Sequence, residues 1–559
     1  MHKLKHILGF SVFWLYILLA TWLIYFSLAV PVGLPQVPNQ EILAINRVQV
    51  DSNFYFFNQN WLQKNKYGLW EMYLEGNAFD RGVAHGKLCV ELNEFQEEAF
   101  VDKIYQLIPS KSYLFLLRDL IAWFNRDIQD YIPQEYLDEI NGISQSADAK
   151  FDFIGPSYYR ILNYHAAHDI GHALQNLALV GCTSFALNEN SDDKKLIIGR
   201  NFDFYVNEAF AKNKIVAFVK PDKGHKFVYI TWASFIGVVS GMNDAGLTLT
   251  INAAKSRYPT KSADPISLIA REILQYAGNI EEAIAIAKKR QSFVSESFLI
   301  GSAADNRAIL IEKTPNKIDT YSGVGNTLVC ANHFQGVTFM HDSLNVQDMR
   351  VSPSVYRQDR CEELIAKDSI KNYNSVARIL RDMRGKENAD IGMGNEKAMN
   401  QLISHHSVIF MPHQRLIWVS TSPYQMGVYI AYDLNKIFSE DAGLKKPKVL
   451  YIDSLTIAAD PFLVSDNYNN FEEYKILKSQ LQTANFWGHD ISNINDFAQK
   501  LIRLNTNYYY VYKLLGDYYF THNERRKAYD MYQKALSLEI EHQSTRAQLE
   551  ERLIEIEKE

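Results

Sequence analysis

The sequence lacks the features that mark several large classes of protein. Its 559 residues contain only four cysteines, too few for a disulfide scaffold, and none forms the C-x-x-C pair of a zinc or thioredoxin-type site. The net charge is −6 and no basic stripe is present, so nothing indicates a nucleic-acid partner. With 47% hydrophobic and 22% charged residues the chain is globular, and its length predicts two or more domains.

Charge is also missing from Ile7 to Val30, a continuous apolar run. As a helix it would extend roughly 36 Å, enough to cross a bilayer and longer than the apolar part of a secretory signal peptide. Lys3 and Lys5 precede it, so the positive-inside rule places the rest of the chain outside the cytoplasm, which in a bacterium is the periplasm. We expect residues 1–30 to form an uncleaved single-pass transmembrane anchor; a long, cleaved signal peptide is the alternative.

Residues 31–181 are predicted to be mostly helical, with one strand-like piece at 68–75. Glycines at 76, 82 and 86 surround a turn into a helix, an arrangement that can bind phosphate. Their spacing fits neither the P-loop nor the Rossmann fingerprint, so tight packing is the preferred interpretation.

The pattern changes in residues 182–460, where apolar strands alternate with hairpin turns. Two helices are predicted between residues 266 and 290, with Gly278-Asn279 as the break between them. Stacked hairpins with inserted helices indicate an α+β layered sandwich. The predicted strands lie at residues 195–199, 215–219, 227–232, 247–251, 407–411, 415–420 and 427–432, with a further hairpin from 298 to 311.

Residues 467–559 are predicted to be helical throughout, with a charged capping helix at 544–559. One helical pair, preceded by a degenerate unit at 471–507, has the small and aromatic residues of a tetratricopeptide (TPR) repeat. We therefore expect an all-α TPR-like hairpin that binds a protein partner; a plain helical hairpin is the alternative. The residues at repeat spacing are Tyr512, Leu515, Gly516, Tyr519, Ala528, Tyr532 and Ala535.

Cys182 is the cysteine that a buried apolar role explains least, because it follows Gly181 and opens a strand. The stretch Gly199-Arg-Asn-Phe-Asp-Phe204 comes next, and a hairpin through Asp192-Asp193 would bring Arg200 and Asp203 back beside Cys182. The other three cysteines fit the pattern of small buried hydrophobes: Cys89, Cys330 and Cys361.

This arrangement around Cys182 has a chemical logic. A thiol reacts as thiolate, and a nearby guanidinium lowers its pKa. If the Gly181–Cys182 bond were cut, the new α-amine would have a pKa of about 7.7–8.0 and would be a useful general base near neutral pH. A carboxylate such as that of Asp203 can orient this amine.

The combination of Gly181-Cys-Thr-Ser184 with Gly199-Arg-Asn-x-Asp203 resembles the Ntn-hydrolase family that contains the isopenicillin N acyltransferases, peptidase family C45. Choloylglycine hydrolases and acid ceramidases are more distant relatives of that family. The resemblance covers roughly residues 68–435, including Gly82-x-x-His85-Gly86 and the stretches 407–410 and 418–423. It implies an αββα sandwich and autocatalytic cleavage between Gly181 and Cys182.

The resemblance also implies a role for each matching residue. Cys182 would be the nucleophile, and two asparagines would donate hydrogen bonds to the oxyanion, each worth roughly 10²–10³ in rate. Asn243 competes with Asn252 for the first of these roles, although Asn243 lies in a turn that needs it locally. Arg360 is the alternative to Arg357 as a supporting arginine. The implied catalytic set is Cys182, Arg200, Asp203, Asn252, Asn332 and Arg357.

Two other sites compete with this one. The helical spacing His165-x-x-His168-x-x-x-His172 would allow a metal site, but it lacks the Glu of H-E-x-x-H, so we expect no metal and no cofactor. A papain-like pair of Cys182 with His333 or His405 would need no cleavage.

The sequence thus predicts an autocleaved cysteine amidohydrolase or acyltransferase that acts on a small N-acyl or peptide-like amide through a thioester. Hydrolysis is favoured, because the chain has no coenzyme A signature. The alternative from another class is a membrane-tethered TPR interaction protein with an inactive Ntn-like domain.

Overall fold

The computed structural model describes residues 13–18, 20–22, 24–25, 30, 33–108, 110–174, 179–189, 195–205, 207–257, 259, 261–368, 372–403, 405–439 and 446–558. Half of the predicted membrane anchor at residues 7–30 therefore lies outside the described residues. Among those that are described, no helix combines the length and the apolar character that a membrane crossing needs.

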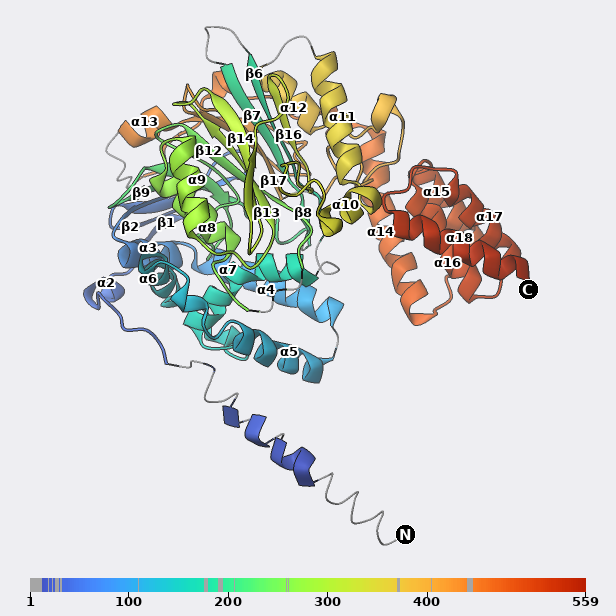
Figure 1. The fold of residues 1–559 in the computed structure, drawn as a ribbon, viewed down its shortest axis with the longest axis horizontal. Coiled ribbons are helices and arrows are strands. Elements are labelled where there is room, and N and C mark those ends of the chain that lie inside the picture. The colour runs from blue at the N-terminus through green and yellow to red at the C-terminus, as the bar shows by residue number, and fades with distance from the viewer. Residues whose placement is uncertain are drawn as a thin grey trace.

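Two antiparallel-rich sheets form the centre of the molecule (Figure 1). In the described part of the chain the larger sheet has the order β1-β2-β3-β4-β9-β10-β11-β12-β13-β14-β15, and the smaller one has the order β16-β6-β7-β17-β18-β19. The strands of the larger sheet are Val48–Asp51, Phe54–Phe57, Asn60–Lys64, Trp70–Gly76, Ile215–Pro221, Phe227–Thr231, Ser240–Asn243, Leu247–Ala253, Glu296–Ser302, Arg307–Lys313 and Ile318–Tyr321. Those of the smaller sheet are Thr327–Cys330, Thr183–Glu189, Lys195–Phe202, His406–Met411, Leu416–Ser420 and Tyr429–Asp433.

The sheets pack face to face, and helices cover both outer faces. An apolar core between the sheets includes Phe218 and Val228 from one sheet and Val408 and Ile417 from the other. A second core lies between the larger sheet and helices α3 (Ala78–Leu88), α6 (Gln134–Ser144), α7 (Ser157–Leu174), α8 (Ile266–Tyr276) and α9 (Ile280–Lys289). A third lies between the smaller sheet and helices α11 (Ser354–Lys367) and α12 (Tyr373–Leu380). This layering is the αββα order expected from the sequence.

The prediction of a single strand in residues 31–181 is wrong, because β1, β2 and β3 precede β4 there. These strands have only four or five residues each, so they are too short to show a clear period. Asn58, between β2 and β3, has φ = 54°, the left-handed conformation that a tight hairpin turn requires. The rest of this segment is helical and also contains α2 (Glu41–Ala44), α4 (Val90–Leu107) and α5 (Lys111–Phe124).

Gly82 and Gly86 serve close packing, as predicted, whereas a Cβ on Gly76, which has φ = 113°, would meet nothing within 4 Å. A Cβ atom on Gly82 would lie 2.0 Å from the carbonyl oxygen of Glu139 on α6. On the α6 side, a Cβ on Gly142 would lie 2.3 Å from the carbonyl oxygen of Phe79. The two helices can therefore touch through their backbones only because both positions lack side chains.

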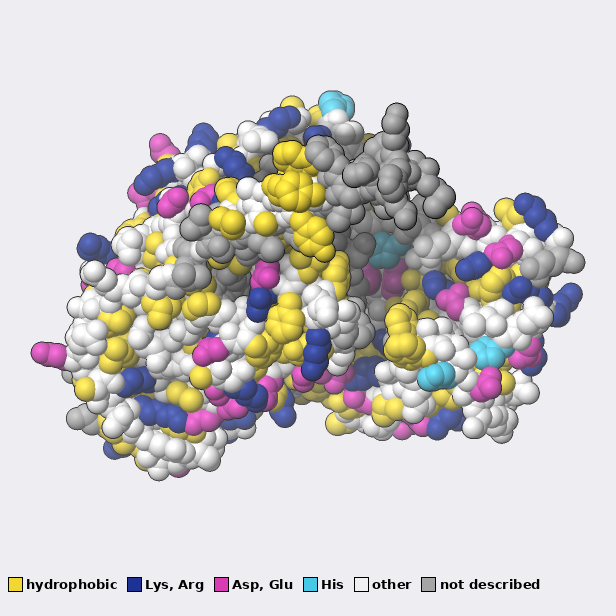
Figure 2. All heavy atoms as spheres, turned by 90° about the horizontal axis from the view of Figure 1, so that it is seen from below, with side chains coloured by type: hydrophobic (Ala, Val, Ile, Leu, Met, Phe, Trp, Pro, Cys, Tyr) yellow, Lys and Arg dark blue, Asp and Glu magenta, His cyan; other side chains and the backbone are white. Residues whose placement is uncertain are grey.

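The C-terminal helices form a smaller lobe beside the layered part (Figure 1). On the face seen in Figure 2 a hollow sets this lobe apart, and acidic and basic side chains are interspersed over its surface. Gly516 on α16 packs against the ring of Tyr532 on α17, where a Cβ would lie 2.4 Å from a ring carbon. Helix pairing at the expected positions is confirmed, whereas a TPR identity stays a prediction. The helices of the lobe are α14 (Asp466–Trp487), α15 (Ile494–Leu504), α16 (Tyr509–Thr521), α17 (Arg525–Leu536) and α18 (Gln543–Lys558).

One pairing joins distant parts of the chain within the larger sheet. β4 lies parallel to β9, in register from Trp70 opposite Ile215 to Gly76 opposite Pro221. The N-terminal strands are therefore continuous with the strands that follow Cys182. The remaining helices, α10 (Ser343–Val351) and α13 (Leu434–Ser439), lie among the later strands in the sequence.

Candidate active site

Cys182 lies between two short pairings that bring the predicted neighbours beside it. Before it, β5 (Leu179–Val180) pairs with β8 (Phe204–Tyr205), and the amide of Gly181 donates to the carbonyl oxygen of Asp203 at 3.1 Å. After it, β6 pairs with β7 so that Ser184 lies opposite Arg200. The predicted return of the chain is confirmed, while its turn through Asp192-Asp193 lies outside the described residues.

Arg200 is the charged group in direct contact with the thiol. Its Nη2 atom lies 3.7 Å from Cys182 Sγ, and both residues are buried. Nη1 donates to the carbonyl oxygen of Val239 at 2.6 Å and to Ser240 Oγ, and Nη2 donates to the carbonyl oxygen of Ile251. The guanidinium is thus fixed by β11 and β12 of the larger sheet, while Arg200 itself belongs to the smaller sheet.

Burial, however, has a larger effect on the pKa of the Cys182 thiol than the contact with Arg200 has. It raises the pKa of Cys182 to about 11, although Arg200 pulls that pKa downward. A nearby guanidinium favours the thiolate, as expected from the sequence, but the cost of burying that charge is larger here. In the uncut chain, Cys182 is therefore a neutral thiol near pH 7.

Asp203 is a fully buried carboxyl group with little to compensate its charge. Its Oδ1 accepts a hydrogen bond from Gln425 Nε2 at 3.4 Å, and its Oδ2 has no hydrogen-bond partner in the described part of the chain. Burial raises the pKa of Asp203 to about 8, and Arg357 and Arg200 offset only part of that rise. An acceptor of this kind can receive a cation or a proton that appears next to it.

The two predicted asparagines lie near the site, but their amides donate to main-chain carbonyls here. Asn252 Nδ2 donates to the carbonyl oxygens of Cys330 at 3.0 Å and Ala331 at 3.2 Å, and its Oδ1 accepts from Ser184 Oγ at 2.7 Å. Asn332 Nδ2 donates to the carbonyl oxygen of Ala253 at 2.9 Å. Their oxyanion role stays a prediction.

Arg357 forms hydrogen bonds that connect the start of β6, next to Cys182, with two other segments of the chain. Its Nε donates to Thr183 Oγ1 at 3.2 Å, its Nη1 to the carbonyl oxygen of Glu396 at 2.9 Å, and its Nη2 to Asn332 Oδ1. The structure therefore brings four of the predicted residues close together: Cys182, Arg200, Asp203 and Arg357.

The alternatives to Asn252 and Arg357 bind other parts of the molecule. Asn243 Nδ2 donates to the carbonyl oxygens of Leu274 and Ala277 at the end of α8, at 2.9 and 2.7 Å. Arg360 Nε pairs with Asp382 Oδ2 at 2.9 Å. Neither has a contact with Cys182 among the described residues.

The histidines that competed for a role have local partners. His333 Nδ1 lies 2.7 Å from Ser354 Oγ, and His405 Nδ1 lies 2.9 Å from His406 Nδ1. No hydrogen bond or ion pair between a histidine and Cys182 occurs in the described part of the chain. His165 Nε2 accepts from the amide of Ile236 at 3.0 Å.

The proposed metal alternative finds no support in what is described. No group of three His, Cys, Asp or Glu residues that could hold a metal ion occurs among the described residues, and the side chains of His168 and His172 lie outside them.

Two glutamines of the site were missed by the sequence analysis. Gln401 Nε2 donates to the carbonyl oxygen of Gly181 at 2.7 Å, and Gln425 contacts Asp203 as described above. Both lie more than 200 positions along the chain from their partners and outside the regular elements, so no periodic pattern marks them.

A small aromatic cavity of about 60 Å³ opens beside Phe204, the residue after Asp203. Phe210 and Trp232 also line it: the Phe204 and Phe210 rings meet edge to face with centroids 5.9 Å apart, and the Phe210 and Trp232 rings are tilted with centroids 5.1 Å apart. Phe235 extends the wall, with its centroid 4.3 Å from that of Trp232. This lining suits an apolar group.

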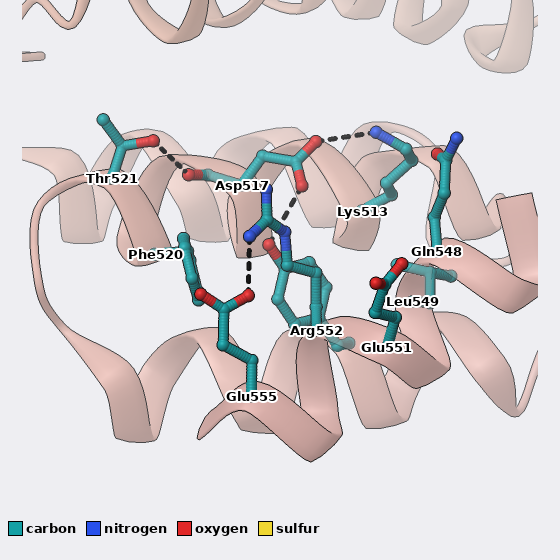
Figure 3. A pocket seen from close by; sticks show the side chains of 10 residues that line it. Lys513, Asp517, Phe520, Thr521, Gln548, Leu549, Glu551, Arg552 and Glu555 are labelled. Atoms are coloured by element: carbon teal, nitrogen blue, oxygen red, sulfur yellow. Dashed lines mark hydrogen bonds and ion pairs between the residues drawn. The ribbon is translucent and has the colours of Figure 1, made fainter. Parts of the chain in front are cut away.

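A larger cavity, about 500 Å³, lies in the C-terminal lobe and contains none of the predicted site residues (Figure 3). Four of its charged side chains pair with each other: Lys513 Nζ lies 2.7 Å from Asp517 Oδ2, and Arg552 Nη1 lies 2.7 Å from Glu555 Oε2. We therefore place the candidate active site at Cys182, although Cys182 itself lines neither of these two cavities.

Comparison with known proteins bears on this assignment. The family model described as acyl-coenzyme A:6-aminopenicillanic acid acyl-transferase matches residues 188–422. The predicted resemblance is confirmed. The match to this acyl-transferase family contains Arg200, Asp203, Asn252, Asn332 and Arg357, and it begins just after Cys182.

Individual relatives of known sequence are distant. An uncharacterized protein of Archaeoglobus fulgidus is 27% identical over 258 residues, covering 42% of this chain and 41% of that protein. The N-acylethanolamine-hydrolyzing acid amidase of Caenorhabditis elegans is 23% identical over 208 residues, covering 35% of this chain and 56% of the amidase. The chain thus spans about half the length of these two relatives.

Among solved structures, a mutant conjugated bile acid hydrolase from Clostridium perfringens aligns over 48% of this chain and 96% of its own, with 13% identity and a TM-score of 0.32.

Proposed function

We propose that the chain is an Ntn-type cysteine amidohydrolase or acyltransferase that cuts itself before Cys182 and then cleaves the amide bond of a small N-acyl or peptide-like substrate. The observation that carries this proposal is the buried carboxyl of Asp203, one oxygen of which lacks a partner in the described part of the chain, beside the Gly181–Cys182 bond. Cutting that bond creates an α-ammonium group, which this carboxylate would bind and orient.

The proposed reaction uses both ends of Cys182. The α-amine takes the proton of the neutral thiol, so that a thiolate attacks the substrate carbonyl and the same amine protonates the leaving amine. Arg200 stabilises the thiolate from 3.7 Å. The aromatic cavity next to Phe204 would hold an apolar acyl group. Water, or an acceptor amine, then resolves the thioester.

The test is the mass of the purified chain. We expect two fragments that meet at Gly181 and Cys182, and a single uncut chain for Cys182→Ala. A single wild-type chain whose Cys182 resists thiol reagents would overturn the proposal, whereas an uncut chain that still reacts there would favour the papain-like mechanism. Activity assays of the cut chain with N-acyl amino acids, bile-acid conjugates and β-lactams would then define the substrate. Adding an acceptor amine to the same assays would distinguish acyl transfer from hydrolysis.

We further propose that residues 7–30 anchor the enzyme in a membrane with the site outside the cytoplasm, and that the C-terminal helices bind a protein partner. The apolar run and the lysines before it support the first idea. Release of the full-length protein from membranes by carbonate washing would contradict it.

A further inference from the structure

The Gly181–Cys182 bond is held by a hydrogen bond that the reaction on substrate does not use. Gln401 Nε2 donates to the carbonyl oxygen of Gly181 at 2.7 Å, and Gln401 is 1% exposed. This carbonyl belongs to the bond that would be cut. When a thiolate adds to such a carbonyl, the oxygen becomes an anion, and a donor at 2.7–3.1 Å from it stabilises the transition state.

We infer that Gln401 is a catalytic residue of the self-cleavage step, where it stabilises the oxyanion on Gly181, and this inference rests on the proposed function above. The Cys182 sulfur bonds to the carbonyl carbon of Gly181, the carbon–nitrogen bond breaks, and the thiol proton ends on the freed amine of Cys182. Water then cleaves the thioester, which regenerates the thiol and leaves a carboxylate on Gly181.

The fit of Gln401 around Gly181 supports this role. A Cβ atom at position 181 would lie 2.5 Å from Gln401 Nε2 and 2.6 Å from its Oε1. The whole amide group of Gln401 therefore occupies the space that any larger residue before Cys182 would need. This close approach explains why a glycine stands at position 181, because without a side chain there the Gln401 amide can reach the Gly181 carbonyl oxygen.

The segment that carries Gln401 is fixed from several sides. Asn201, between Arg200 and Phe202 on β7, donates through Nδ2 to the carbonyl oxygens of Leu380 and Met399, each at 2.8 Å. The amide nitrogen of Asn400 donates to the carbonyl oxygen of Asp382 at 2.8 Å. Asn201 therefore acts as a positioning residue for Gln401, which gives the central asparagine of Gly199-Arg-Asn-Phe-Asp203 a purpose.

The rate of self-cleavage tests the inference directly. In full-length Gln401→Ala, we expect the fragment that begins at Cys182 to appear roughly 10²–10³ times more slowly than in the wild type, measured by intact mass after a brief induction. Gln358→Ala is the matched control, because Gln358 Nε2 donates to Gln335 Oε1 at 3.0 Å and has no contact with Gly181. It should be cut at the wild-type rate.

A second variant covers the case in which Gln401→Ala folds poorly. Gly181→Ala would push the Gln401 amide away, so it should slow the cut as well, and the double variant should be no slower than the slower single one. Hydroxylamine, which captures thioesters, should not restore the rate of Gln401→Ala, because the impaired step precedes the thioester.

The outcomes separate the two ideas. A wild-type chain that is never cut would overturn both the proposed function and the role of Gln401. A wild-type chain that is cut, with Gln401→Ala cut equally fast, would overturn only the role of Gln401. Independent, multiplying effects of Gly181→Ala and Gln401→Ala would also contradict it.

Discussion

Two fully buried carboxyl groups, one in the helical layer and one beside Cys182, have opposite electrostatics. Glu139 on α6 accepts from Arg81 Nη2 at 2.8 Å and from Arg271 Nη2 at 3.2 Å. Burial raises its pKa, but the two arginines more than offset this, so the net pKa is lowered. Asp203 has no ion pair in the described part of the chain, and burial raises its pKa to about 8. Equal burial thus accompanies a lowered pKa where two arginines pair with the carboxylate and a raised pKa where no ion pair compensates the burial.

The largest expected effect follows from Asp203→Asn. An amide cannot hold the α-ammonium charge of Cys182, so amide hydrolysis by the cut chain should fall by roughly 10⁴-fold, as when an orienting carboxylate is replaced elsewhere. Mass spectrometry and a substrate assay would measure this. The control is Asp264→Asn, which changes another buried aspartate whose pKa burial raises, here to about 7. Normal substrate hydrolysis by Asp203→Asn would remove the contrast between the two regions.

Glu139→Gln should act on stability instead. It leaves Arg271 without its carboxylate partner inside the protein, which typically costs about 3–5 kcal/mol. We expect a lower urea midpoint for unfolding, whereas the rate of self-cleavage in the folded fraction should stay as in the wild type. A loss of cleavage without loss of stability would show that the helical layer takes part in the chemistry.

The pH dependence of stability should differ between the two groups. The pKa of Asp203 is raised above its unfolded value near 3.9. Its contribution to the free energy of unfolding is therefore complete below about pH 4 and is lost as the pH rises toward about 8. The slope should be at most about 1.4 kcal/mol per pH unit. Glu139, with its lowered pKa, contributes above its unfolded value and loses that contribution in acid.

Urea unfolding of the uncut Cys182→Ala chain, with and without Asp203→Asn, would measure this difference. The second substitution should flatten the slope between pH 5 and pH 8, and an unchanged slope would contradict the raised pKa.

The smallest effect is expected on the surface of the helical layer. Lys150 pairs with Glu94 and Glu98, but these side chains are about half exposed. Exposed pairs of this kind contribute little in water. Lys150→Ala should leave the unfolding midpoint unchanged, and a measurable drop would mean that the surface of this layer also depends on its charges.

The sequence predicted the part of the site that is close along the chain. Cys182 directly precedes β6, Arg200 lies on β7, and Asp203 directly follows β7. The apolar pattern of these two adjacent strands and the turn between them are visible in the local sequence. Gln401 and Gln425 come from irregular segments far along the chain, where no period or turn signal connects them with the nucleophile. The pKa of the thiol was also beyond the sequence, because burial from all sides sets it. Likewise β1, β2 and β3 were missed because each is too short to show alternation.

The parallel pairing of β4 with β9 has a consequence for the enzyme after the proposed cut. β4 would belong to one polypeptide and β9 to the other, yet they remain neighbours through seven registered positions in the interior of one sheet. The product would therefore be a heterodimer encoded by a single gene, with a subunit interface that includes the β4–β9 ladder and the apolar core between the N-terminal helices and the larger sheet. It should migrate as one particle in native gel filtration and separate only under conditions that unfold the sheet.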